Sequence, residues 1–143
     1  MKIIAFTGNR ADYYLQRPAL LRLNSYPSFS LELIVSGSIL EEHDKRTLKD
    51  IENDNLLVTQ TIQLNDSLSI NHISCISQIS LAVEKILKDS NPDLCIVYAD
   101  RYESFAFALS SFHCNIPLIH IEAGDITNGG TYDDQLRHCI SKM

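Results

Sequence analysis

The chain has 143 residues, of which 45% are hydrophobic and 21% are charged, which is enough for one buried core and too little for two ordinary domains. Its formal net charge is -6, and it contains no run of Lys or Arg. Binding to nucleic acid or to an anionic membrane needs a concentrated basic face, so this composition argues against both partners. No segment reaches membrane-spanning length.

The chain shows no export signal, because its short apolar start is broken at once by Arg10 and Asp12. Four widely spaced cysteines lie inside apolar patterns, which favours buried free thiols over disulfides or a zinc site; they are Cys75, Cys95, Cys114 and Cys139. We therefore expect a cytoplasmic protein.

Runs of branched apolar residues alternate with helical patterns along the chain. The runs predict strands at residues 2–7, 30–36, 57–63, 94–99 and 117–121. Such alternation implies right-handed crossovers and a parallel sheet, so we expect an α/β fold with three layers, of the Rossmann-like kind. Because the carboxyl ends of parallel strands share one edge, polar residues that follow the strands are expected to gather there and bind a ligand.

The first predicted helix contains Pro18, which removes a hydrogen bond and clashes with the preceding turn. We expect a turn over residues 12–15 and regular helix from about Arg17. The clearest helix is predicted from about Asn71 to Lys88, stopped by Asn91-Pro92-Asp93. Its expected apolar stripe consists of Ile73, Ile76, Ile79, Val83 and Ile86.

Residues 102–114 predict a largely buried helix, with Asp100 placed as an N-cap or first-turn carboxylate. Its wide apolar face consists of Phe105, Ala106, Ala108, Leu109 and Phe112. Residues 125–132 predict a loop, and residues 133–142 predict a helix that starts with two acids and is still short when the chain ends at Met143.

The segment Gly8-Asn-Arg10-Ala-Asp12 matches neither a dinucleotide fingerprint nor a Walker-type phosphate loop. Gly8 permits close backbone approach, the Arg10 guanidinium can bind a phosphate or carboxylate, and Asp12 can cap or orient. A capped turn with a surface arginine explains the segment equally well.

Three further charged groups follow strands or begin a helix. Asp100-Arg101 could pair a proton-transferring carboxylate with a cation, although N-capping by Asp100 explains it equally well. His120, Glu122 and Asp125 surround Gly124, where a partly desolvated carboxylate could serve as general acid or base.

The helix from Asp133 has acids in its first turn and an Asp–Arg pairing with Arg137, which helix chemistry alone explains. His43 and His72 are expected to be exposed, and His113 is expected near a helix end. None of the histidine spacings is typical of a metal site.

Taken together and in order, four motifs resemble the UDP-N-acetylglucosamine 2-epimerase family over almost the whole chain. They are Gly8-x-Arg10-Ala-Asp12-Tyr13, Asp100-Arg101-Tyr-Glu103, His120-Ile-Glu122-Ala-Gly124 and Asp133-Asp134-x-x-Arg137-His138-x-Ile-x-Lys142. The Arg-Ala-Asp-Tyr and Asp-Asp-x-x-Arg-His forms resemble the hydrolysing branch, which serves sialic-acid and related nonulosonic-acid pathways. The family commonly has His-Gly where this chain has Tyr98-Ala99, which leaves the choice of sugar open.

The resemblance implies the N-terminal half of a two-domain fold similar to that of glycosyltransferase-B proteins, without the C-terminal domain that holds most of the UDP. It implies conversion of UDP-N-acetylglucosamine to UDP and N-acetylmannosamine by elimination and then hydration, with no metal or redox cofactor. Asp100, Glu122 and Asp134 are the implied acid/base residues. The implied substrate-binding residues are Arg10, Arg101, His120, Asp133 and Arg137. We expect residues 1–143 alone to be inactive or nearly so.

Other interpretations stay open at this point. The substrate could be a UDP-bacillosamine-type sugar, the enzyme could belong to the non-hydrolysing branch, or the chain could be a non-catalytic nucleotide-sugar-binding module. Family members often form dimers through this domain, and the helical surfaces near residues 71–88 and 101–114 could serve a homo-oligomer.

Overall fold

The computed structural model describes residues 1–41, 45–64 and 71–143. It contains a five-stranded sheet in the order β3-β2-β1-β4-β5, in which every neighbouring pair is parallel. The strand bounds confirm the five predicted strands, with ends that differ by at most one residue. The strands are β1 (Lys2–Thr7), β2 (Ser30–Ser36), β3 (Leu57–Ile62), β4 (Leu94–Tyr98) and β5 (Leu118–Ile121).

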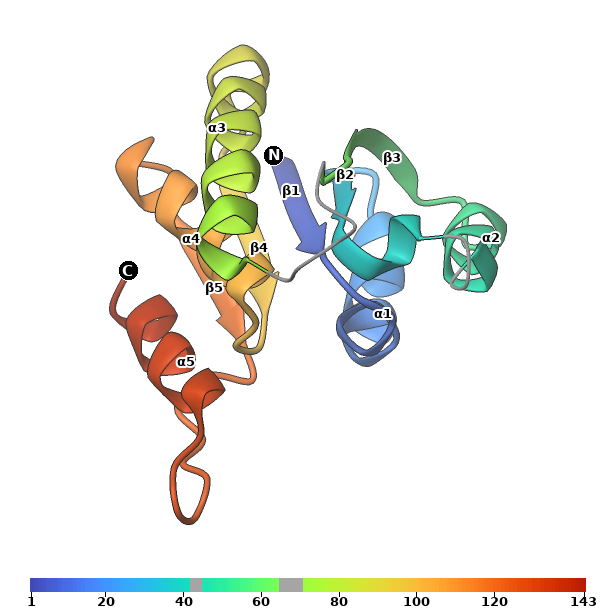
Figure 1. Ribbon diagram of the computed structural model, residues 1–143. Helices are drawn as coiled ribbons and strands as arrows, with labels where there is room; N and C mark the ends of the chain where they lie inside the picture. The colour runs from blue at the N-terminus through green and yellow to red at the C-terminus, as the bar shows by residue number, and fades with distance from the viewer. Residues whose placement is uncertain (42–44, 65–70) are drawn as a thin grey trace.

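Helices cover both faces of the sheet, which confirms the three-layer architecture (Figure 1). The helices are α1 (Arg10–Asn24), the short 3-10 helix η1 (Gly37–Leu40), α2 (Lys45–Asn53), α3 (His72–Ser90), α4 (Tyr102–His113) and α5 (Tyr132–Lys142). Side chains of α1, η1 and α2 pack on one face, and side chains of α3, α4 and α5 pack on the other. Alternation along β1 serves both layers, since Ile4 and Phe6 face α3 and α4 while Ile3 and Ala5 face α1 and α2.

The expected turn over residues 12–15 is wrong, because α1 runs without interruption from Arg10 to Asn24 with Pro18 inside it. An interior proline costs about 3 kcal/mol. The helix is held on both sides of the proline, because Tyr13 and Leu20 are fully buried against the sheet. Burial of side chains of this size contributes about 1.5–3 kcal/mol each, which offsets the lost hydrogen bond.

The helices predicted at residues 71–88 and 102–114 form to within two residues, and most of their expected apolar residues face the core: Ile79, Val83, Ala106 and Ala108 are buried, and Ile76, Ile86 and Phe105 are partly buried against them. In α3 the buried positions are Cys75, Ile79, Val83 and Leu87, while Ile73 is 72% exposed. In α4 the outer residue Phe112 is exposed, whereas Glu103 is buried. All four cysteines are free thiols. Cys75 and Cys95 are buried as predicted, Cys114 is partly buried, and the expected burial is wrong for Cys139, which is exposed.

The strand order places a topological switch point between β1 and β4. From β1 the chain crosses to β2 on one side, and from β4 it crosses to β5 on the other. In Figure 1 the arrowheads of β1, β4 and β5 all point towards the end of the molecule where α5 begins. Crevices beyond the carboxyl ends at such a point are where open α/β sheets bind ligands.

Candidate active site at the carboxyl edge of the sheet

The register of the sheet aligns the segments that follow β1, β4 and β5. Ile96 in β4 pairs with Ala5 in β1 and with Ile119 in β5. Three residues further along each strand, the chain therefore reaches Gly8, Ala99 and Glu122 at the same level. Arg10, Asp100 and Glu122 accordingly lie at one edge, which is the geometry that the sequence pattern required.

Two of these strands end in a left-handed residue that is not glycine. Ala99 has φ 54° and Glu122 has φ 60°, and each is the first residue after its strand. A side chain in this region costs about 1–2 kcal/mol relative to glycine. The neighbouring backbones stay connected, because the Ala99 N–H donates to Ile121 O over 3.0 Å. The chain thus turns at the residue directly after β4 and at the residue directly after β5.

Arg137 of α5 links the ends of β4 and β5 to the last helix. Its guanidinium forms an ion pair with Asp100, lies 3.4 Å from an Asp134 carboxylate oxygen, and donates to Asp125 O over 3.2 Å. The expected N-cap role of Asp100 is therefore wrong, since Arg101 is the N-cap of α4 and makes no side-chain capping bond. Asp100 instead joins the sheet to α5.

Asp134 forms hydrogen bonds that hold the loop preceding α5 in place. Its carboxylate accepts a hydrogen bond from the Thr127 hydroxyl over 2.8 Å and another from Thr127 N over 3.0 Å. These bonds, the first of them above all, lower the pKa of Asp134. Its carboxyl group is consequently ionised at neutral pH and suited to pair with a cation.

His120, in β5, connects this strand to the end of β4 and to α5. Its Nε2 donates to Ala99 O over 2.6 Å, and its Nδ1 lies 3.0 Å from Ser141 Oγ in α5. Burial lowers the pKa of His120. The imidazole is thus held in place by the backbone directly after β4 and by a hydroxyl of α5.

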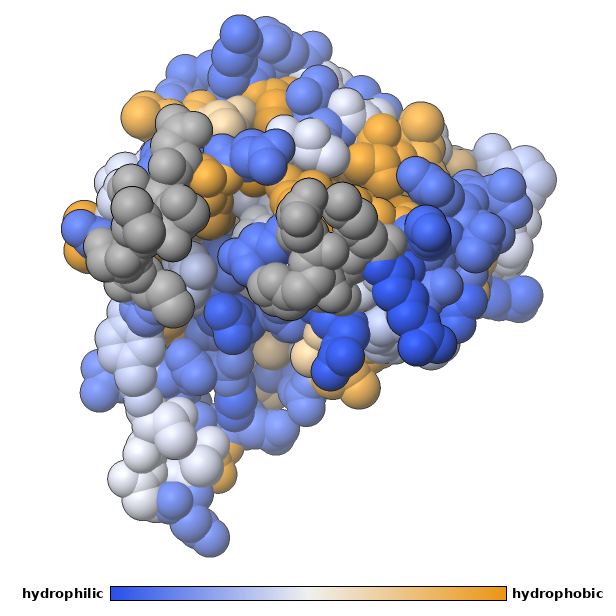
Figure 2. All heavy atoms as spheres, turned by 45° about the vertical axis from the view of Figure 1, so that its right-hand side comes forward, coloured by the Kyte–Doolittle hydropathy of each residue, from blue (hydrophilic) through white to orange (hydrophobic). Residues whose placement is uncertain are grey.

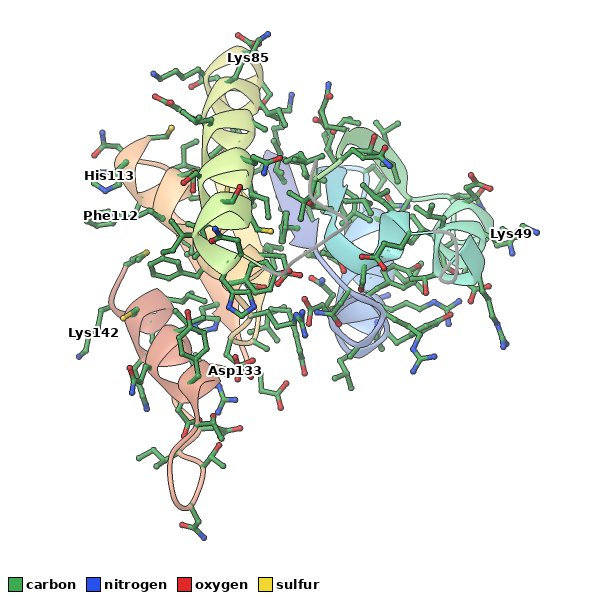
Figure 3. The ribbon with its side chains drawn as sticks, viewed as in Figure 1. Lys49, Lys85, Phe112, His113, Asp133 and Lys142 are labelled. Atoms are coloured by element: carbon green, nitrogen blue, oxygen red, sulfur yellow. The ribbon has the colours of Figure 1, made fainter. Side chains whose placement is uncertain are left out.

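Three of the predicted site residues remain open to a ligand. Arg10, Glu122 and Asp133 are exposed and form no ion pair with any residue that the structure describes. Asp133 lies at the start of α5, at the end of the molecule towards which the strands point (Figure 3). Figure 2 shows that this end of the visible face is mostly hydrophilic.

A second, buried charged cluster lies at the switch point between β1 and β4. Arg101 donates to Glu103 through Nε over 3.2 Å and through Nη2 over 3.4 Å, and Glu103 is 1% exposed. Asp12 is also buried, and its burial, with a smaller contribution from the charge of Glu103, raises its pKa to about 7. The Asn9 side chain caps α1 by accepting from Asp12 N over 3.0 Å. The capped-turn interpretation of this segment is confirmed, with Asn9 as the cap.

Sequence reasoning gave Glu103 no role of its own, although a signal was present. Glu103 lies three and four residues before Ala106 and Phe107, so it shares their buried face of α4. A carboxylate at such a position needs a partner, and the adjacent Arg101 is that partner. Glu103 is the residue that a search for charges inside apolar stripes would have found.

The histidines differ in part from expectation. His72 is half-buried rather than exposed, because its ring stacks on Tyr102 with a centroid distance of 4.4 Å. His113 ends α4 as expected, and His43 lies outside the described residues.

Within residues 1–41, 45–64 and 71–143 no group of three or more metal-ligating side chains is placed to hold a metal ion, and no helix is long and apolar enough to cross a membrane.

Comparison with known sequences identifies relatives of one kind. Residues 21–143 match the family model described as UDP-N-acetylglucosamine 2-epimerase. The UDP-N,N'-diacetylbacillosamine 2-epimerase (hydrolyzing) of Legionella pneumophila is 33% identical, over 99% of this chain and 38% of that protein. A UDP-N-acetylglucosamine 2-epimerase of Neisseria meningitidis is 32% identical, over 99% of this chain and 37% of that protein. The chain thus spans less than two fifths of the relatives' length.

Solved structures show the same fold. The UDP-GlcNAc 2-epimerase from Neisseria meningitidis bound to UDP-GlcNAc superposes with a TM-score of 0.85 at 20% identity, covering 99% of this chain and 38% of that one. The Methanocaldococcus jannaschii UDP-GlcNAc 2-epimerase in complex with UDP-GlcNAc and UDP gives a TM-score of 0.80 at 21% identity, covering 98% and 38%.

Proposed function

The chain belongs to the UDP-N-acetylglucosamine 2-epimerase family, and on that premise we propose that it forms one wall of the active site of a hydrolysing UDP-N-acetylglucosamine 2-epimerase. The proposed reaction converts UDP-N-acetylglucosamine and water to UDP and N-acetylmannosamine. A free 2-epimeric sugar of this kind would supply nonulosonic-acid biosynthesis. A UDP-sugar is accordingly the proposed partner of the site.

The observation that supports this proposal most is the Arg137 network at the same sheet edge as Glu122. It brings a guanidinium and two carboxylates to the edge where Glu122 stands exposed. Elimination requires a base that takes the C2 proton while the C1–O bond breaks and its electron pair leaves with UDP. It also requires a cation that stabilises the charge on the departing diphosphate.

We assign the proton transfer at C2 to Glu122, because its carboxylate is exposed and unpaired among the described residues. Asp100 and Asp134 are the further acid/base residues of the proposal, and both are ion-paired with Arg137 before substrate arrives. After elimination the glycal carries a C1=C2 double bond. Addition of water at C1 and return of a proton to the opposite face of C2 then give the inverted sugar.

The three arginines of the proposed site differ in how exposed their side chains are. Arg10 is exposed and Arg101 is 45% exposed, so both can reach the diphosphate directly, while Arg137, the third proposed substrate-binding cation, is paired with Asp100 and Asp134 before substrate arrives. Guanidinium groups suit this task because they bind phosphate oxygens in a bidentate manner. His120 and Asp133 complete the proposed substrate-binding set at the same edge.

The domain assignment is part of the proposal. Residues 1–143 correspond in fold to 37–39% of several solved epimerase chains. We propose that they act as an N-terminal domain whose site is closed by a second, UDP-binding domain, and that they do not turn over substrate alone.

One alternative substrate has a specific observation behind it. The Legionella pneumophila relative, at 33% identity, is named for UDP-N,N'-diacetylbacillosamine. A second acetamido group on the sugar leaves the chemistry at C1 and C2 unchanged. The two substrates therefore have to be compared directly.

The test uses the complete protein that contains this chain, incubated with each UDP-sugar in deuterated water. We expect equal amounts of UDP and free 2-epimeric sugar, with one deuterium at C2. Formation of the UDP-linked epimer instead would assign the protein to the non-hydrolysing branch. Retention of both UDP-sugars, with nucleotide binding intact, would replace the proposal with a binding module. Glu84→Gln, on α3 and paired with Lys88, is the matched control for a carboxylate change outside this edge.

A further inference from the structure

Glu103 is a buried carboxylate with one cationic partner. Its residue exposure is 1%, and both of its carboxylate oxygens receive hydrogen bonds from the Arg101 guanidinium, over 3.2 Å and 3.4 Å. Such a two-point contact fixes the plane of a guanidinium as well as its position. The Arg101 side chain is 45% exposed. It therefore bonds to the buried Glu103 carboxylate and also reaches solvent at the carboxyl edge.

Backbone packing holds Glu103 itself in place. A Cβ atom at Gly8 would stand 2.9 Å from the Glu103 Cβ, and one at Gly37 would stand 3.0 Å from Glu103 Oε1. Both values are shorter than ordinary van der Waals contact, so the two glycines leave room for the glutamate and for nothing more. The loops after β1 and β2 therefore form the walls of the pocket that holds this carboxylate.

The arrangement leaves part of the guanidinium for a ligand. A guanidinium has five N–H donors, and Glu103 accepts from two of its nitrogens. Arg101 also lies over the Tyr102 ring, with its Cζ 5.6 Å from the centroid. Arg101 directly follows Asp100 after the end of β4, which borders the topological switch point, where open α/β sheets bind ligands.

We propose that Glu103 is a positioning residue that fixes the Arg101 guanidinium for the diphosphate of the UDP-sugar. This inference rests on the proposed function. Glu103 is too deeply buried to touch the substrate, so it acts only through Arg101. A cation fixed before the substrate arrives needs no reorganisation when negative charge develops on the leaving UDP, which is how preorganised groups accelerate such steps.

The kinetic test compares Glu103→Gln with the matched control Glu84→Gln in the complete protein. Glutamine preserves the volume of the side chain and removes its charge. We expect kcat/KM for the UDP-sugar to fall about ten- to one-hundred-fold in Glu103→Gln, and to stay within about twofold in the control. Unchanged kcat/KM in a folded Glu103→Gln protein would overturn the proposal.

A double variant separates positioning from general support of the fold. Arg101→Ala removes the guanidinium, so adding Glu103→Gln to it is expected to lower kcat/KM by no more than about a further twofold. If the two losses multiply instead, Glu103 acts independently of Arg101 and the proposal is wrong.

A measurement on the unaltered protein keeps the inference testable if Glu103→Gln does not fold or if no UDP-sugar is turned over. Nuclear spin relaxation of arginine Nε–H groups reports how ordered each side chain is. We expect Arg101 Nε–H to be as ordered as the backbone and Arg10 Nε–H to be mobile. Equal mobility of the Arg101 and Arg10 Nε–H groups would overturn the positioning role of Glu103. If Arg101 is ordered but no UDP-sugar is turned over, the result counts against the proposed function alone.

Discussion

The carboxyl edge of this sheet is built in two different ways on its two sides. Around β1 and β2 the carboxyl groups of Asp12 and Glu103 are buried, and Glu103 is packed against Gly8 and Gly37. Around β5 and α5, residues 122–133 are all exposed, and order comes from the Arg137 ion pairs and the Thr127–Asp134 hydrogen bonds. The first region is shaped by close packing and the second by polar contacts.

The difference bears on how an active site of this kind can work. A packed region holds a cation at constant geometry, because moving it requires the backbone to move. A region held by polar contacts near solvent can rearrange when a charged ligand competes for them. We therefore expect the β1 side to bind the diphosphate in a fixed position and the β5 side to adjust around the sugar.

The largest expected effect comes from breaking the packed side with Gly37→Ala. Gly37 has φ +62°, and a Cβ there would stand 2.3 Å from Gly8 O. Left-handed strain and a clash with backbone together are expected to cost more than about 4 kcal/mol of unfolding free energy, measured by urea denaturation. Gly124→Ala is the control, because Gly124 has φ +83° with no atom near its Cβ position and should lose only about 1 kcal/mol. Equal losses would show that the contact with Gly8 is unimportant.

The next effect concerns Asp12 and depends on pH. Because the folded-state pKa of Asp12, about 7, lies above the unfolded value of 3.8, its contribution to stability is complete below pH 3.8 and is lost as the pH rises through 7. Asp12→Asn removes this loss, so the variant should be more stable than the wild type at pH 8 by up to about 4 kcal/mol. Urea midpoints measured at pH 5 and pH 8 provide the check.

Asp54 supplies the control of opposite sign for the Asp12 experiment. Its carboxylate accepts hydrogen bonds from Arg17, each over 2.5 Å, and these bonds lower its pKa. Its contribution to stability is therefore present above the unfolded-state pKa and is lost as the pH falls through the folded-state value. Asp54→Asn should destabilise the protein at pH 8, where Asp12→Asn stabilises it. Destabilisation by both variants at pH 8 would contradict the account of Asp12.

A smaller, local effect is expected on the polar side from Arg137→Ala. The variant leaves Asp100 and Asp134 without their shared cation and removes the bond to Asp125 O. Hydrogen exchange of the α5 amides should become about tenfold faster, while exchange in β1 stays unchanged. Arg17→Ala, which breaks the ion pair with Asp54, should affect α1 and α2 instead. Faster exchange throughout the sheet in Arg137→Ala would mean that the two sides are not separate.

The sequence predicted the strands well because buried parallel strands leave unbroken apolar runs, as Leu94 to Tyr98 does. It failed at residues 12–15, where a turn was expected before Pro18, because tertiary burial of Tyr13 and Leu20 outweighs the local penalty of the proline. It also misjudged Asp100, because a cap and an ion pair to a residue 37 positions away look the same in a sequence. Glu103 could have been found as a charge on the apolar face of α4, but the two glycines that enclose it, Gly8 and Gly37, are brought against it only by the folded chain.

The central claim is that Glu122, exposed at the same sheet edge as the Arg137 network, moves the proton at C2. Its most direct test is Glu122→Gln in the complete protein, with single-turnover release of UDP and UDP affinity measured side by side. We predict that UDP release slows by about a thousandfold, while UDP affinity and the urea midpoint stay at wild-type values. Release of UDP at the wild-type rate, with deuterium still entering C2, would contradict the account.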